Sequence, residues 1–405
     1  MTLVQIGPSR VELGSWNDLL VAAREGLIDE RTHCELKKGL PPSSQNVEVA
    51  RDLASLTVEG GVLIYGVADA GGGRAGDVVG VTEPASAVTR LVGIADGIVQ
   101  PSMVCDVRIL ASPTNSNRAC VVVVVPPSSV APHRADDRYW GRSAEGKRVL
   151  SDAEVAMLFH SRRQRLDGFL EHLEGLRRTL DPKPETLTSH IYFSAQPAQP
   201  TMANDPPWRG QHILHLLNSA GLPNAGWGGA DLTSATHSRS HPYGVLGESH
   251  AATDTVDADR ALRVLVRDSG AIDFVATFGS RDLEIEHGTI HAFQLSVTII
   301  LIDQCVRLTG HVARQLGSAG SWRLGARATD LRGLASVAAY SGMSISRAAH
   351  YPEEEFRQVI EVHASRLQST PEAVVAELLA PLVRGFGVAA AFPYSHPQEM
   401  FRRNV

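Results

Sequence analysis

The chain has 405 residues, of which 43% are hydrophobic and 20% are charged, and its formal net charge is −6. This length predicts two or three domains, and the composition is that of a protein with ordinary buried cores. The negative balance excludes a globally basic nucleic-acid-binding protein, so nucleic acid could be contacted only through a local patch. The four cysteines show no CxxC spacing, and the N-terminus has no signal-peptide pattern. Both features favour a cytoplasmic protein without a disulfide framework or a cysteine zinc site.

Residues 21–160 predict an α/β domain, after a short lead-in over residues 1–20. The hydrophobic pattern predicts these elements in chain order: a helix over 15–27 with Ser15 as N-cap, a polar strand around 34–37, a helix over 46–56, a buried strand in "GGVLIYGVAD", a hairpin turn in "GGGRAG", a helix over 85–98, strands in "MVCDVRIL" and "ACVVVVVPPSS", and a helix that begins at the Ser151–Glu154 capping box.

Residues 161–228 are interpreted as a helix followed by a proline-rich linker, because they contain many prolines and few periodic hydrophobic residues. Residues 229–405 predict a second α/β domain, with two strands joined by a turn at 268–270 and a C-terminal helix. A long apolar helix over 289–316 is interrupted by polar residues, which is typical of a core or interface helix and not of a membrane span. We therefore expect an α/β (α+β) fold with no membrane segment.

The glycine run Gly71–Gly76 formally fits the GxGxxG pattern of dinucleotide sites. Such a site needs a helix that opens at the last glycine, because the helix N-terminus holds the pyrophosphate. Here the strand-like "DVVGV" follows, and no GK[ST] sequence is present. The run is therefore interpreted as a hairpin turn and not as a phosphate loop.

Three carboxylates form the strongest candidate site: Glu30, Glu35 and Asp69. Charged residues beside a strand are usually solvated, which is the ordinary interpretation of Glu30 and Glu35. If the three converged they would repel one another unless a divalent cation lay between them, and oxygen ligands of this kind select Mg²⁺ or Mn²⁺. Lys37 lies two residues after Glu35, hence on the same strand face, where it could meet a phosphate.

The segments "ERTHCELKK", "LTVEGGVLIYGVAD" and "VVVVVPPSSVAPHR…YWGRS" together resemble the Schlafen-type AlbA-like domain. The resemblance implies an AlbA-like fold with a mixed sheet, and a metal-dependent endoribonuclease that acts on structured RNA, transfer RNA above all. It places the catalytic and metal-binding roles on Glu30, Glu35 and Asp69, with Lys37 at the family's lysine. Contacts to the nucleic-acid backbone would fall to Lys38, Tyr139 and Arg142.

The resemblance also implies a homodimer and, by analogy, a role in stress or anti-phage defence. Two features depart from the family pattern, Thr57 where an Asn is usual and Ala68 where a second Asp is frequent. The alternative function is a non-catalytic DNA- or RNA-binding regulator with the same fold. A nucleotide-binding regulator is a third, weaker alternative, since no phosphate loop supports it.

Overall fold

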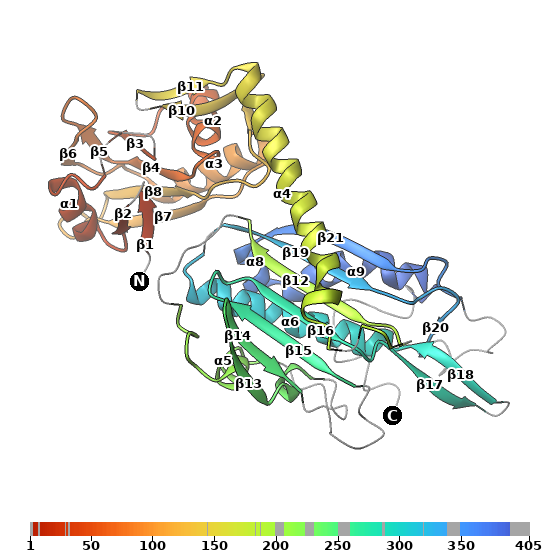
Figure 1. The fold of residues 1–405 in the computed structure, drawn as a ribbon. Coiled ribbons are helices and arrows are strands. Elements are labelled where there is room, and N and C mark those ends of the chain that lie inside the picture. Colours follow the sequence, from red (N-terminus) through yellow and green to blue (C-terminus); the bar gives the residue numbers. More distant parts are fainter. Residues whose placement is uncertain are drawn as a thin grey trace. The chain divides into compact units, whose positions relative to one another are not determined.

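The computed structural model describes residues 3–6, 9–28, 30, 33–143, 145–182, 184–186, 188–198, 206–222, 231–249, 260–285, 288–318, 320–337 and 349–388. It divides into two compact units, Met1–Leu166 and Asp167–Val405 (Figure 1). Both units combine helices and sheets, which confirms the predicted α/β class.

The elements of the first unit are, in chain order, β1 (Leu3–Ile6), β2 (Ser9–Glu12), α1 (Trp16–Arg24), β3 (Cys34–Lys37), the 3-10 helix η1 (Ser43–Gln45), α2 (Asn46–Leu56), β4 (Gly61–Tyr65), β5 (Val67–Asp69), β6 (Ala75–Val78), α3 (Pro84–Gly97), β7 (Asp106–Ala111), β8 (Ala119–Val125), β9 (Arg134–Ala135), β10 (Arg138–Ser143) and β11 (Gly146–Val149). The Ser15 hydroxyl accepts a hydrogen bond from the Asp18 N–H, which confirms the predicted N-cap of α1.

A four-stranded mixed sheet in the order β3-β4-β8-β7 forms the centre of this unit. Strand β3 pairs with β4 in parallel, and the other pairs are antiparallel. Alternate residues of β4 face opposite layers, since Leu63 and Tyr65 pack with α2 and α3 whereas Val62 and Ile64 pack with α1. With both faces covered, β8 is apolar throughout, as its sequence predicted.

The strand predicted from "GGVLIYGVAD" is divided at Gly66, whose backbone has φ +99°. A side chain at this position would also collide with the backbone of Gly80, 2.8 Å from a built Cβ. Strand β4 therefore ends at Tyr65, and β5 pairs only with β6. The glycine run is the turn of this β5–β6 hairpin, which confirms the predicted hairpin.

A three-stranded antiparallel sheet, β11-β10-β9, lies against helix α2 (Figure 1). In this sheet Arg142 of β10 is paired directly with Lys147 of β11. The packing brings Lys147 of β11 to the acidic side chains Glu48 and Asp52 of α2.

Helix α4 (Asp152–Thr179) spans the boundary between the two units and begins at the predicted capping box, where Ser151 and Glu154 exchange hydrogen bonds. The second unit then contains β12 (Ile191–Pro197), α5 (Ile213–Ser219), the 3-10 helix η2 (Leu232–Ser234), β13 (His237–His241), β14 (Gly244–Glu248), β15 (Leu262–Arg267), β16 (Ile272–Ala276), β17 (Ser280–Ile285), β18 (Gly288–Phe293), α6 (Leu295–Gln315), β19 (Ser321–Ala328), β20 (Ala335–Ser336), β21 (Phe356–His363), α8 (Ala364–Ser369) and α9 (Pro371–Gly385).

A seven-stranded sheet in the order β13-β14-β15-β16-β12-β19-β21 organises this unit, and every pair in it is antiparallel. Helices α6 and α9 contribute to the large core on one face. The C-terminal half of α4 packs on the other face through Leu173 and Leu176. Helix α6 is long and apolar enough to cross a membrane by length and composition alone, but 78% of its most apolar window is buried inside this unit.

The second unit differs from the sequence interpretation in two places. Strand β12 lies inside the region interpreted as a helix and linker, yet it is a central strand of the large sheet. The long apolar segment expected as one helix begins as strand β18, and helix α6 starts only at Leu295. Residues 199–205 and 223–230 lie outside the described residues.

Candidate functional site

The alternation of strand β3 separates its apolar and charged residues. Cys34 and Leu36 are buried in the core layer beneath α1. Glu35 and Lys37 therefore share the opposite face, on the side of α2, as the spacing predicted. Their side chains meet, since the Lys37 Nζ lies 2.5 Å from the Glu35 Oε1.

Glu35 is a buried carboxylate held by two cations. Its second oxygen, Oε2, lies 2.6 Å from the Nη2 of Arg142, and the side chains of Arg142 and Glu35 are only 3% and 7% exposed. The same Nη2 donates a hydrogen bond to the Cys34 carbonyl at 3.2 Å, so Arg142 fastens β10 to β3. Burial by itself would raise the pKa of Glu35, but the hydrogen bonds and charges of Lys37 and Arg142 hold it below its usual value.

Glu30 lies close enough to Glu35 for the two carboxyl groups to influence each other. Burial and the neighbouring Glu35 carboxylate together raise the pKa of Glu30 to about 6, against the opposing charge of Lys37. The backbone of Glu30 is fixed by the β5–β6 turn, because its N–H donates to the Gly73 carbonyl at 2.5 Å. The glycine run thus fixes the backbone at Glu30.

Two acids of helix α2 extend the charged cluster. Glu48 and Asp52 lie one helical turn apart and both bind Lys147 of β11, with the Lys147 Nζ 2.5 Å from the Asp52 Oδ1. Burial raises the pKa of Asp52, although the nearby Lys147 opposes this shift. Sequence reasoning missed these three residues. The i, i+4 acids of "NVEVARD" and the basic residues around the "GRSAEGK" turn were the signal for them.

Tyr65 of β4 is paired with Lys37 in the sheet register and belongs to the same face. The phenol is fully buried, and its hydroxyl has no hydrogen-bond partner among the described residues. Burial raises the pKa of Tyr65, and the charges of Asp52 and Glu35 add to this shift. A buried hydroxyl of this kind beside acidic groups is a place where a polar ligand would gain a hydrogen bond.

Asp69 is exposed at the end of β5, and its Oδ1 accepts a hydrogen bond from the Gly71 N–H at 2.7 Å. Across the described part of the chain, no group of three His, Cys, Asp or Glu side chains is arranged to hold a metal ion. The structure places Glu30 close to Glu35. Asp69 lies on β5, which the left-handed backbone at Gly66 separates from β4.

The three residues expected to contact nucleic acid differ in their placement. Lys38 is exposed at the end of β3. The ring of Tyr139 packs edge to face against Phe159, with ring centroids 5.9 Å apart. Arg142 is buried against Glu35, so its side chain positions that carboxylate and does not form an open surface contact.

The Glu30–Glu35 pair fits a hard divalent cation by its donor chemistry. Mg²⁺ is commonly held by one or two carboxylates, with water and substrate phosphate oxygens as the remaining ligands. The neighbouring carboxyl groups of Glu30 and Glu35 would supply two such ligands. The mutual repulsion that raises the pKa of Glu30 is what a bound cation would relieve.

No protein-family model matches the chain, and no curated protein matches it. Among solved structures, 31% of the chain matches the N-terminal domain of a protein described as related to the ATP-dependent DNA helicase RecG, from Nitrosomonas europaea. That match has 19% identity, covers 82% of the other chain and has a TM-score of 0.25. In a second match, 34% of this chain aligns with 27% of the DIP2311 protein from Corynebacterium diphtheriae, with 16% identity and a TM-score of 0.22. At these scores neither likeness establishes a shared fold.

Proposed function

We propose that the first unit is a metal-dependent endoribonuclease whose reactive centre is the Glu30–Glu35 pair. The observation that carries the proposal is the buried carboxylate of Glu35, bonded to Lys37 and Arg142, with the carboxyl group of Glu30 close by. The resemblance to Schlafen-type domains supports structured RNA, and transfer RNA in particular, as the substrate. Paired carboxylates next to fixed cations are suited to phosphodiester chemistry, in which negative charge develops on phosphate oxygens.

Each residue has a distinct part in this proposal. Arg142 is buried and fixes the orientation of Glu35, whereas the side chain of Lys37 is 36% exposed and can meet a phosphate from solvent. Glu30 and Glu35 would hold the cation, which when bound lowers the pKa of a water ligand and offsets charge on the phosphate. Lys37 would exchange part of its contact with Glu35 for the incoming phosphate oxygen, and Lys38 would add a second exposed cation.

The proposal is tested by incubating the full chain with transfer RNA in Mg²⁺ or Mn²⁺ and resolving the products on a denaturing gel. Wild-type protein should cut the RNA, EDTA should stop cleavage, and Lys37→Met should slow it by about tenfold or more. Arg24→Met, at an exposed position at the end of α1, is the matched control for loss of one positive charge and should cut like the wild type. Absence of cleavage by the wild type in both metals would reject the nuclease assignment.

A second function, non-catalytic binding of RNA or DNA, is favoured by one observation. The charge of Glu35 is already balanced within the protein by Lys37 and Arg142, and Asp69 is engaged in its own turn. A binder of this kind would show salt-dependent affinity with no turnover. Nucleic-acid binding that persists in Glu30→Gln, together with intact RNA after long incubation of the wild type, would favour this function over the nuclease.

A further inference from the structure

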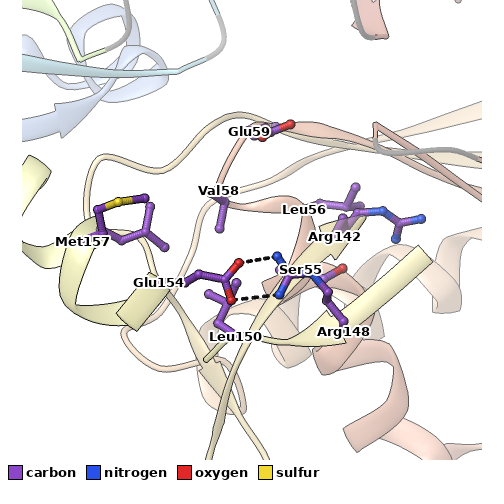
Figure 2. A pocket seen from close by; sticks show the side chains of 12 residues that line it. Ser55, Leu56, Val58, Glu59, Arg142, Arg148, Leu150, Glu154 and Met157 are labelled. Atoms are coloured by element: carbon purple, nitrogen blue, oxygen red, sulfur yellow. Dashed lines mark hydrogen bonds and ion pairs between the residues drawn. The ribbon is translucent and has the colours of Figure 1, made fainter. Parts of the chain in front are cut away.

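A pocket of about 230 Å³ is lined in part by Arg142, and all of its lining residues belong to the first unit (Figure 2). Its wall comes from the C-terminal end of α2, the loop that follows, strands β10 and β11, and the first turns of α4. The lining residues are Ser55, Leu56, Val58, Glu59, Gly60, Gly141, Arg142, Arg148, Leu150, Glu154, Met157 and Leu158. Of these residues, the sequence analysis proposed a nucleic-acid contact only for Arg142.

Arg142 connects this pocket to the candidate reactive centre. The residue lines the pocket, and its guanidinium group bonds to Glu35 at 2.6 Å. In Figure 2 the guanidinium group of Arg142 points away from Met157 and Glu154. A group in the pocket and a phosphate at Lys37 would therefore be separated by one side chain.

The walls and the rim of the pocket have different chemistry. Leu56, Val58, Leu150, Met157 and Leu158 give an aliphatic wall. The volume is below the roughly 300 Å³ at which pockets for drug-sized ligands begin, so the site suits one small ring system. Apolar walls next to a few polar groups are what a single heterocycle requires.

The polar side of the pocket is an ordered guanidinium–carboxylate pair. Arg148 and Glu154 face each other through two hydrogen bonds, drawn as dashed lines in Figure 2, one of them 2.9 Å long. Glu154 is itself fixed by the backbone N–H and the hydroxyl of Ser151, at 2.9 and 2.8 Å. Arg148 thus presents an immobilised guanidinium plane, 41% exposed as a side chain, and such planes stack on nucleic-acid bases.

We propose that this pocket binds one unstacked base of single-stranded RNA, next to the nucleotide whose phosphate lies at Lys37. The inference rests on the proposed function, because it uses the same RNA at the same site. It adds a substrate preference, since a base inside a duplex cannot enter the pocket without being unpaired. Unpaired loops or ends of a structured RNA would be preferred over its helices.

The test measures RNA binding without added divalent cation, so that it does not depend on cleavage. A fluorescent single-stranded RNA is compared with the same strand carrying one abasic nucleotide, moved along the strand to each position in turn. For wild-type protein the dissociation constant should rise by about tenfold at one position, the lower range for loss of a base-stacking contact. Val58→Trp, which fills the pocket, should bind intact RNA as weakly as wild type binds the abasic strand.

Matched controls separate this effect from misfolding. Val47→Trp adds the same side chain at a 40% exposed position of α2 outside the pocket, and should keep the wild-type discrimination. Met157→Asp changes a lining residue that is 65% exposed, so it carries little risk to folding. This variant should weaken the binding of intact RNA more than the binding of the abasic strand. Val92→Asp, 47% exposed on α3 and outside the lining, is its control.

Two results would overturn the inference. The first is a wild-type protein whose dissociation constant does not change with an abasic nucleotide at any position. The second is an equal ratio of abasic to intact dissociation constants in wild type, Val58→Trp and Met157→Asp. Abasic discrimination by a protein that never cleaves RNA would support the pocket and reject only the nuclease. Cleavage of RNA together with no effect of an abasic nucleotide on binding would support the nuclease and reject the pocket.

Discussion

Replacement of Glu35 by Gln tests whether the buried ion pair with Arg142 organises the first unit. The Gln side chain keeps the shape of Glu35 but removes the charge that faces the 3% exposed guanidinium group. Removal of one partner of a buried pair typically costs about 3–5 kcal/mol, because the other charge stays buried. Lys37 adds little, since its 36% exposed ammonium group can turn to water, and exposed pairs contribute roughly 0–1 kcal/mol. We therefore expect Glu35→Gln to lower the free energy of unfolding of this unit by about 3 kcal/mol.

Hydrogen–deuterium exchange read by mass spectrometry in a urea series provides the assay, because peptides report each unit separately. Peptides over β3 and β4 should exchange about a hundredfold faster in Glu35→Gln, the equivalent of that loss. Peptides from β15 and β16 in the second unit serve as the internal control. Glu35→Gln combined with Arg142→Met should recover part of the stability, because no buried charge is then left without its partner. A Glu35→Gln protein within about 1 kcal/mol of wild type, or a double variant less stable than Glu35→Gln, would refute the reasoning.

Three further predictions concern pH and packing. The pKa of Glu30 is raised from 4.5 to about 6, so its contribution to stability is present below pH 4.5 and is lost as the pH rises through 6. The melting temperature of the first unit should therefore fall over this pH range in the wild type but not in Glu30→Gln. An unchanged pH profile in Glu30→Gln would contradict the raised pKa. In the second unit the hydrogen bonds and charges of His172 and Arg267 outweigh burial and lower the pKa of Asp273, so stability that is present above pH 3.8 is lost in acid. Asp273→Asn should flatten that loss in thermal denaturation, and an equal loss in the variant would argue against it. Leu173→Ala should lower the free energy of unfolding of the second unit in urea by about 2–5 kcal/mol, because loss of this fully buried side chain leaves a cavity between α4 and the sheet. A loss below about 1 kcal/mol would show that α4 is not packed as described.

The local sequence pattern was sufficient to predict strand β3 and which of its residues share a face. Alternation put Glu35 and Lys37 on one side and Cys34 in the core, and the structure has this arrangement. The start of α4 was predicted by its capping box, because that motif depends on residues three apart. Its end was not, since the middle of this helix is polar on most sides and has no apolar period.

The parts of the site that depend on tertiary packing could not be predicted from the sequence. The break between β4 and β5, which places Asp69 on a separate hairpin, depends on the left-handed backbone at Gly66. Arg142 was expected on the surface, and only the packing of β10 against α2 and its bond to the Cys34 carbonyl bury it. The pocket beside it combines residues from four separate segments, which no local pattern relates.

The central claim is that the Glu30–Glu35 pair, and not a three-carboxylate group, is the reactive centre. Single-turnover cleavage of transfer RNA in Mn²⁺ compares Glu30→Gln with Asp69→Asn, two substitutions that each remove one negative charge. The account predicts that Glu30→Gln loses at least about a hundredfold in rate, the usual loss when a preorganised charge is removed, whereas Asp69→Asn stays within about threefold of wild type. Cleavage by Glu30→Gln at the wild-type rate, or an equal loss in both variants, would contradict it.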